Sequence, residues 1–243
     1  MKSSIRACIG LTLFLLQACV AADRSTIRGS GTLSSEERPV QGISRISLTT
    51  FGDLTIQLGE AESLVIEAED NLLQYIETPV QGNTLTIRTA RNVDVEPTRN
   101  AKYTLTVKSL EGLEVSSSGS IKAPSLDASK FDIQVSSSGN VTLAGLTADH
   151  LTVDISSSGN VEIGTGEVGD QTITISSSGD YIAGEVRCQS ADVHNSSSGE
   201  ATLWVTDKLK VDLSSSGNVS YFGQPDVTQE ASSSGKVIAL GVK

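Results

Sequence analysis

A four-residue motif, Ser-Ser-Ser-Gly, occurs seven times between Ser116 and Gly235. Its glycines are Gly119, Gly139, Gly159, Gly179, Gly199, Gly217 and Gly235. The first five are spaced by 20 residues, and the last two follow at intervals of 18. A flexible linker would repeat small polar residues without regular apolar flanks, and a catalytic serine would be needed only once. A nearly constant period of this length instead indicates stacked structural repeats.

The residues between the motifs alternate between apolar and polar side chains. Examples are Phe131-Asp132-Ile133-Gln134-Val135 and Val141-Thr142-Leu143. A period of two is typical of β-strands, and no helical periodicity fits within one unit. We therefore expect an all-β fold in which residues 109–243 form a parallel β-solenoid (β-helix). Its coils, each of about 20 residues, would stack about 4.8 Å apart.

The same alternation predicts which side chains point into the solenoid. Inward positions lie four residues before each motif glycine and two and four residues after it, as in Val135, Val141 and Leu143. By this parity the middle serine of each motif also points inward: Ser117, Ser137, Ser157, Ser177, Ser197, Ser215 and Ser233. We expect a stacked corner in which these serines form a hydrogen-bonded ladder, with Ser157 buried and its two neighbours more exposed.

Each motif glycine would mark a bend, either where a side chain would clash or where φ is positive. The alternative interpretation of the motif is an outward-facing hydroxyl surface that binds a ligand. Both interpretations can hold, because the outer serines of each triplet are exposed in either case.

The residue after each glycine offers a second ladder and a weak metal hypothesis. Asn140, Asn160 and Asn218 occupy this position in three coils, and stacked Asn side chains are a known ladder device. Asp180 and Glu200 occupy it in adjacent coils, so their carboxylates could lie about 5 Å apart and hold a cation. A solvated surface pair is the favoured interpretation, and we predict no metal site and no cofactor.

The N-terminus has the layout of a secretory leader. Lys2 and Arg6 precede an apolar run from Cys8 to Leu16 that is too short to span a membrane. Leu16-Gln17-Ala18-Cys19 resembles the bacterial lipobox, which predicts a signal peptide over residues 1–18 and a lipid (acyl chains such as palmitate) on Cys19. Cleavage after Ala22 is the alternative, since Val20-Ala21-Ala22 also suits a signal peptidase.

The leader contains Cys8, and Cys19 would carry the lipid. Cys188 then has no disulfide partner and is interpreted as a small core residue.

Residues 19–27 would form a lipid-anchored tether, and residues 28–108 an N-terminal β part continuous with the solenoid.

Short segments that match a known family run through this part and into the repeats. In order they are Gly29-Ser30-Gly31, Arg38-Pro39-Val40, Ile46, Gly52-Asp53-Leu54, Glu69-Asp70-Asn71-Leu72, Leu85-Thr86-Ile87, Leu113 and the first motif. From Ile27 to Lys243 the chain resembles the putative auto-transporter adhesin head domain (GIN domain) family of bacterial envelope proteins. The resemblance implies a secreted or lipid-anchored protein with a β-helical body, and it carries over no catalytic residues.

Residue content excludes several functions. The formal net charge of −11 argues against nucleic acid as a partner, because phosphate binding needs a basic surface. No G-x-S-x-G elbow, phosphate-binding loop or H-E-x-x-H motif is present. The two histidines are His150 and His194, and Thr174 separates His194 from Asp154 in their shared outward column. We therefore expect a protein that is not an enzyme.

The favoured function is a non-enzymatic envelope lipoprotein whose rigid solenoid displays or binds something, in the manner of an adhesin. Its partner would be a glycan or another envelope protein, and it would contact the membrane only through its lipid anchor. We expect it in the outer membrane, or in the periplasm or medium if cleavage follows Ala22. The alternative function is a polysaccharide-active or cation-binding β-helix.

Overall fold

The computed structural model describes residues 25–232 and 234–243. The predicted leader, Cys19 and Ser233 lie outside these residues. Within them, a short 3-10 helix, η1 (Leu73–Tyr75), accompanies strands and their connections. The expected all-β solenoid with coils about 20 residues apart is confirmed.

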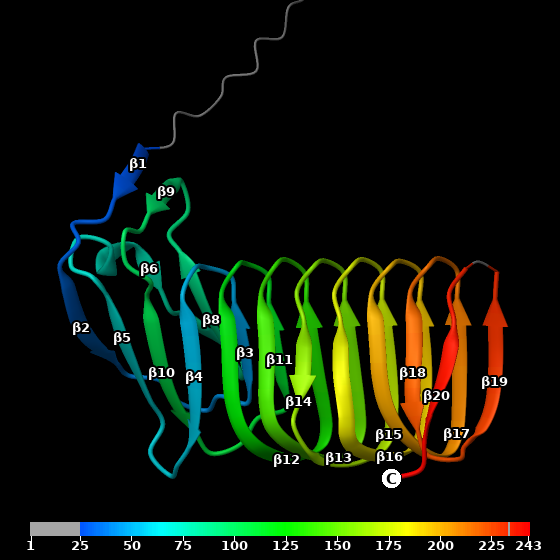
Figure 1. Cartoon of the computed structure of the whole chain (residues 1–243). Helices are drawn as coiled ribbons and strands as arrows, with labels where there is room; N and C mark the ends of the chain where they lie inside the picture. The colour runs from blue at the N-terminus through cyan, green and yellow to red at the C-terminus, as the bar shows by residue number, and fades with distance from the viewer. Residues whose placement is uncertain (1–24, 233) are drawn as a thin grey trace, which may run out of the picture.

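The strands up to residue 108 form one end of the molecule (Figure 1). They are β1 (Ser25–Arg28), β2 (Leu33–Arg38), β3 (Arg45–Leu48), β4 (Asp53–Leu58), β5 (Ser63–Glu69), β6 (Ile76–Glu77), β7 (Val80–Gln81), β8 (Thr84–Thr89), β9 (Val93–Glu96) and β10 (Lys102–Val107).

The solenoid strands follow in the order of the chain. They are β11 (Gly112–Val115), β12 (Ser120–Val135), β13 (Asn140–Ile155), β14 (Val161–Ile163), β15 (Gly166–Ile175), β16 (Tyr181–Asn195), β17 (Glu200–Leu213), β18 (Asn218–Phe222), β19 (Asp226–Ala231) and β20 (Val237–Gly241).

Each coil lies in parallel register on the one before it. Phe131 pairs with Leu151 and Ile133 with Val153, a step of 20 residues. Val193 pairs with Val211, a step of 18, and the shorter coil is absorbed by register shifts between Ile182 and Ser190. The result is a flattened coil with two sheets, joined by a sharp turn at one edge and a rounded bend at the other (Figure 1). The Ser-Ser-Ser-Gly motifs form the sharp edge.

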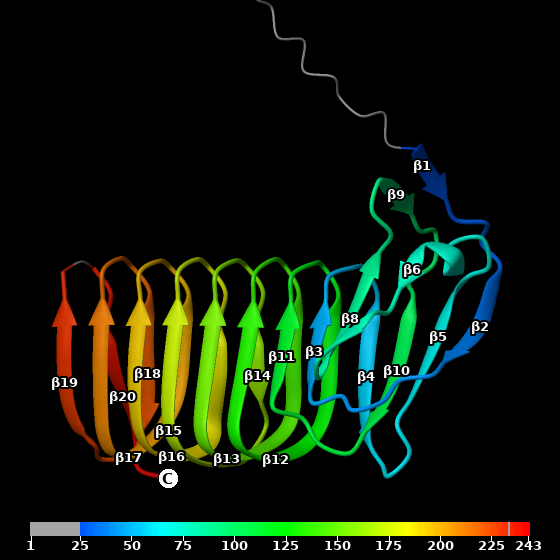
Figure 2. The ribbon, with the colours of Figure 1, turned by 180° about the vertical axis from the view of Figure 1, so that it is seen from behind.

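Both sheets continue from the repeats into the N-terminal strands. On one face, β12 pairs in parallel with β4, which pairs in parallel with β10. On the other face, visible in Figure 2, β11 pairs in parallel with β3, and β3 with β8. Beyond β10 the pairing becomes antiparallel, first to β5 and then from β5 to β2. These antiparallel strands close this end of the solenoid.

The predicted inward apolar columns form most of the core. Those two residues after each glycine, from Ile121 to Val219, are at most 1 % exposed. In the last coil the register keeps the same columns, with Ala231 beside Leu213 and Val237 beside Val219, but these side chains are not fully buried. Ala231 and Ala239 are exposed and Val237 is half-buried, because no described strand covers that coil.

The corner glycines are required for close contact between coils. A Cβ atom on Gly159 would lie 1.9 Å from the carbonyl oxygen of Gly139 and 2.8 Å from that of Ser137. The φ angles of the motif glycines lie outside the left-handed region. Of the two reasons considered for glycine here, clash with the neighbouring backbone is therefore the one that applies.

A stacked polar face as the candidate binding site

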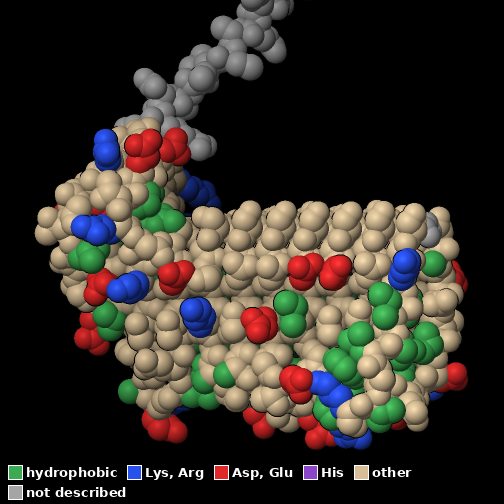
Figure 3. Space-filling model, in the orientation of Figure 1, with side chains coloured by type: hydrophobic (Ala, Val, Ile, Leu, Met, Phe, Trp, Pro, Cys, Tyr) green, Lys and Arg blue, Asp and Glu red, His purple; other side chains and the backbone are tan. Residues whose placement is uncertain are grey.

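The motif serines line one edge of the solenoid as a regular ridge (Figure 3). In the third coil Ser156 and Ser158 are exposed and Ser157 is half-buried, and the coils on either side repeat this order. Ser157 is thus less buried than expected, because the corner is so sharp that water reaches the inner side of the turn. Ser233 lies outside the described residues.

The middle serines of the first coils bond to the backbone of the preceding coil. The Ser117 hydroxyl donates to the Thr50 carbonyl oxygen at 2.5 Å, and the Ser137 hydroxyl donates to that of Ser116 at 3.1 Å. In later coils the glycine N–H makes the link instead, as from Gly217 to the Ser197 carbonyl oxygen at 2.8 Å. Hydrogen bonds from serine hydroxyls in the first coils, and from glycine N–H groups in the later coils, thus join adjacent corners.

The residues after the glycines form a ladder of side chain to backbone. The Asn140 Oδ1 atom accepts a hydrogen bond from the N–H of Asn160 at 3.1 Å. Asn160 Oδ1 accepts from the N–H of Asp180 at 2.9 Å. The same bond joins Asn218 to Lys236 at 3.1 Å. A short side chain that ends in an oxygen acceptor therefore satisfies the first N–H of the next coil, which explains the recurrence of Asn and Asp at this position.

Asp180 and Glu200, the weak candidates for a cation, belong to this ladder. Asp180 Oδ1 accepts from the Glu200 N–H at 2.9 Å, and Glu200 Oε1 lies 3.5 Å from the Asn218 Nδ2 donor. In the described part of the chain, no three His, Cys, Asp or Glu side chains gather as a metal site would need. Asp180 and Glu200 therefore take part in the hydrogen bonds that join adjacent coils.

The sheet beside this ladder carries a shallow hollow of about 390 Å³. Its outward lining includes Ser120, Lys122, Asn140, Thr142, Asn160 and Glu162. Lys122, Thr142 and Glu162 pair in register across three coils, so a cation and a carboxylate stand on either side of a hydroxyl. Such a surface can donate and accept many weak hydrogen bonds, and it holds no isolated buried charge.

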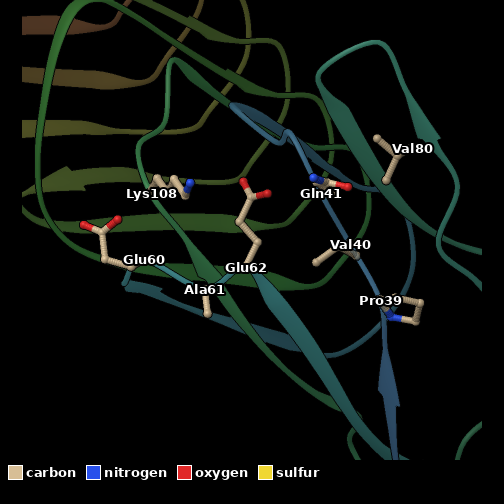
Figure 4. A pocket seen from close by; sticks show the side chains of 8 residues that line it. All are labelled: Pro39, Val40, Gln41, Glu60, Ala61, Glu62, Val80 and Lys108. Atoms are coloured by element: carbon tan, nitrogen blue, oxygen red, sulfur yellow. The ribbon is translucent and has the colours of Figure 1, made fainter.

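Two other hollows lie toward the N-terminal end. One, of about 610 Å³, is bordered by Glu60, Glu62 and Lys108 (Figure 4). Glu62 is already engaged there, since it accepts hydrogen bonds from the N–H groups of Gly42 and Ile43 at 2.6 and 3.2 Å. The other, of about 500 Å³, is bordered by an ion pair between Arg45 and Asp132 at 3.0 Å. Glu62 therefore joins two loops, and the Arg45–Asp132 pair joins two strands, so these groups have a structural role in their hollows.

Both histidines have acidic neighbours that the sequence reasoning missed. His150 Nδ1 lies 3.3 Å from Asp170, and His194 Nε2 lies 3.2 Å from Asp192. His194 Nδ1 is also 3.9 Å from Asp212 in the next coil. The period of 18 residues places Asp212 beside His194 in the next coil, and the two are paired in register. All these side chains are well exposed, on the outside of the solenoid.

Cys188 is buried within the rounded edge, in register with Val168. Burial, together with the nearby charges of Asp170 and Asp207, raises the pKa of its thiol to about 12. At neutral pH the thiol is therefore protonated and a poor nucleophile.

Comparison with known proteins identifies relatives of the whole fold. The family model described as "Putative auto-transporter adhesin, head GIN domain" matches residues 43–225. A structure described as a putative adhesin from Bacteroides fragilis is similar with a TM-score of 0.77 and 22 % identity, over 89 % of this chain and 98 % of that one. A putative adhesin from Parabacteroides merdae matches with a TM-score of 0.72 and 21 % identity, over 89 % and 99 % of the two chains.

A protein from Parabacteroides distasonis described as a putative lipid binding protein has the same fold, with a TM-score of 0.72 and 24 % identity. It is matched over 89 % of this chain and 100 % of its own. At such identities the likeness concerns the fold alone. No curated protein matches the chain significantly. Within residues 25–232 and 234–243, none of the helices has the length and apolar character needed to cross a membrane.

Proposed function

Because the chain belongs to the auto-transporter adhesin head GIN-domain family, we propose that it is a non-enzymatic binding module of the bacterial cell envelope. The observation that carries this proposal is the stacked polar face beside the serine corner. Its side chains are held at the spacing of the coils by hydrogen bonds from one coil to the next. A rigid, periodic surface of this kind suits a repetitive polar partner, of which a glycan chain is the simplest.

The surface would bind through many weak contacts. Each exposed hydroxyl or amide contributes little alone, because it exchanges bonds to water for bonds to the ligand. Affinity should therefore rise with the number of coils engaged, as in multivalent binding. A partner protein of the envelope with a repeated polar surface would fit the same face.

Anchoring by lipid at Cys19 is the second part of the proposal. Acyl chains on this residue would tether the solenoid to a membrane, the outer membrane in a Gram-negative host. Changing Cys19 to Ala should move the protein from the membrane fraction to the soluble fraction. If the fractionation is unchanged, cleavage after Ala22 and a protein free in the periplasm or medium become the better description.

A glycan array tests the binding proposal. The purified protein is screened with and without calcium, and hits are compared with a variant carrying both Asn140→Ala and Thr142→Ala. We expect a modest loss of affinity in this variant, because neighbouring coils still engage. Thr172→Ala, an exposed threonine on the opposite sheet, is the matched control and should bind as the wild type does.

Two outcomes of the same screen would redirect the function. Lipid vesicles are included because one structural neighbour is described as lipid binding, and binding to them alone would contradict the glycan proposal. Turnover of a bound polysaccharide that is abolished by Asp180→Asn or Glu200→Gln would favour the polysaccharide-active alternative. Calcium-dependent binding lost in those variants would favour a cation site.

A further inference from the structure

Trp204 and Phe222 stand side by side on the outside of the solenoid, at the end opposite the N-terminal strands. They occupy adjacent strands, β17 and β18, and pair in register. Trp204 is the only tryptophan of the chain, and both rings are half-buried. Gly184, on β16, lies beside the Phe222 ring, which a Cβ atom there would meet at 3.4 Å.

A cation already lies over these rings. The Lys243 Nζ atom is 4.4 Å from the centroid of the Phe222 ring and 5.6 Å from that of Trp204. It donates a hydrogen bond of 2.6 Å to the Gly184 carbonyl oxygen and forms an ion pair with Glu185. The Lys243 side chain is only 19 % exposed. An organic ammonium group is bound by such a set of groups: two aromatic faces, a carbonyl oxygen and a carboxylate.

A turn in the backbone brings Lys243 to this place. Gly241 has a φ of +108°, and its carbonyl oxygen accepts a hydrogen bond from the Gly223 N–H at 2.9 Å. Few contacts other than those of the ammonium group hold the segment beyond this turn: Val242 is 69 % exposed. Lys243 can therefore leave the rings without disrupting the coils.

We propose that Trp204, Phe222, Glu185 and the Gly184 carbonyl form an ammonium-binding site that takes a lysine side chain of a partner protein when Lys243 moves away. Charge favours such a partner, because this chain has a net charge of −11 and attracts basic proteins. Hydrophobic side chains gather at this end of the face (Figure 3). The exposed Leu240, on β20 beside β18, and the exposed Val242, next to Lys243 in the chain, provide the apolar contact that a protein interface adds.

This site differs from the polar face proposed above. It lies on β16 to β18, whereas that hollow lies mainly on β12 to β14, and it selects a cation where the polar face selects hydroxyl and amide groups. Failure of either proposal leaves the other standing.

The fluorescence of Trp204 provides the test, since no second tryptophan contributes to the signal. The protein and its Lys243→Ala variant are titrated at low salt with a tri-lysine peptide and with the same peptide acetylated on every side chain. We expect the variant to bind tri-lysine about tenfold more tightly than the wild type does, because its own cation no longer competes. The acetylated peptide should leave the emission unchanged.

Two further variants separate this site from general attraction to an acidic protein. Adding Glu185→Gln to Lys243→Ala should remove the gain in affinity, whereas Lys236→Ala, an exposed lysine of the same coil, should behave as the wild type. Thermal unfolding of each variant establishes that the solenoid is intact. Equal binding of both peptides, equal affinity with and without Lys243, or a fluorescence response to neutral oligosaccharides instead would overturn the proposal.

Discussion

Glu69 joins three segments of the N-terminal part: the end of β5 and the loops that hold Gly31 and Thr98. It is buried, yet it accepts hydrogen bonds from the Gly31 N–H at 2.6 Å, the Thr98 N–H at 2.8 Å and the Thr98 hydroxyl at 2.6 Å. Burial raises the pKa of Glu69, but these bonds and a longer one from Arg99 outweigh it and lower the pKa to about 2. The ionised carboxylate thus ties two loops to the end of β5.

We expect Glu69→Gln to lower the stability of the protein at neutral pH, because the amide carries no charge and turns an NH₂ group toward donors. The pKa of Glu69 is lower in the folded state, so its stabilisation is present above about pH 4.5 and is lost as the pH falls toward 2. Urea unfolding of both proteins across this range should show their difference shrink as the pH falls. Glu67→Gln, which removes only an exposed pair with Lys102, should have little effect at any pH.

Gln171 is an exception within an apolar column. It pairs in register with Leu151 and Ala191 and is 2 % exposed. Its Oε1 accepts a hydrogen bond from the buried Tyr181 hydroxyl at 2.7 Å, while its Nε2 has no partner among the described residues. The Gln171 side chain therefore supplies the hydrogen-bond acceptor that the buried Tyr181 hydroxyl needs, while its own NH₂ donor is left without an acceptor in the described part of the chain.

A double-mutant cycle tests this pairing. Gln171→Leu should lower the free energy of unfolding by about 1–3 kcal/mol, because it leaves the Tyr181 hydroxyl buried without an acceptor. Adding Tyr181→Phe should recover most of the loss, since both polar groups are then gone. Chemical denaturation of the two single variants and the double variant gives the coupling. Strictly additive effects would show that the two side chains act independently.

The corner is the element that sets how closely the coils approach. Gly159→Ala would place a methyl group 1.9 Å from the Gly139 carbonyl oxygen, and backbone on both coils would have to move. We expect a loss of about 3 kcal/mol or more by chemical denaturation. Ser158→Ala, one residue away and exposed, is the control and should change stability by less than about 0.5 kcal/mol. Similar losses at both positions would contradict the contact described here.

The pairing of the repeat strands could be predicted from sequence, whereas for the β part before them only the strand character could be predicted. A period of 20 places Val141 under Val161 without knowledge of anything else in the chain. In contrast, β5 pairs with β2 and β10, and no repeated letter marks these distant partners. For the same reason, hydrogen bonds that join separate segments, such as those of Glu69 to Thr98, leave no local pattern in the sequence.

The candidate sites divide in the same way. The Asn and Asp ladder follows from one column of the repeat, so its residues could be identified beforehand even though the bonds could not. The site at Trp204 depends on the hydrogen bond from Lys243 to the carbonyl oxygen of Gly184, a residue 59 positions earlier in the chain. The turn at Gly241 causes this placement, and the repeat period does not predict it. The sequence pattern therefore gives no sign that the two aromatic side chains form a site.

At the scale of the whole molecule, the two ends of the solenoid differ. Antiparallel strands close the N-terminal end, whereas Ala231 and Ala239 of the last coil are exposed. In a stacked array each coil is stabilised by its neighbours, so a coil with one neighbour is less stable than a coil with two. Local opening should therefore begin at β19 and β20 and move inward.

Hydrogen–deuterium exchange measured by mass spectrometry tests this order. We expect peptides from β19 and β20 to exchange fastest among the strands of the repeats, β16 to be intermediate, and β13 to be the most protected. The strand β4 is the control, because it pairs on both sides, with β10 and β12, and should be as protected as β13 although it lies outside the repeats. Uniform protection from β12 to β20 would mean that the solenoid opens as one unit, in which case the uncovered coil is held by contacts other than those of its neighbour.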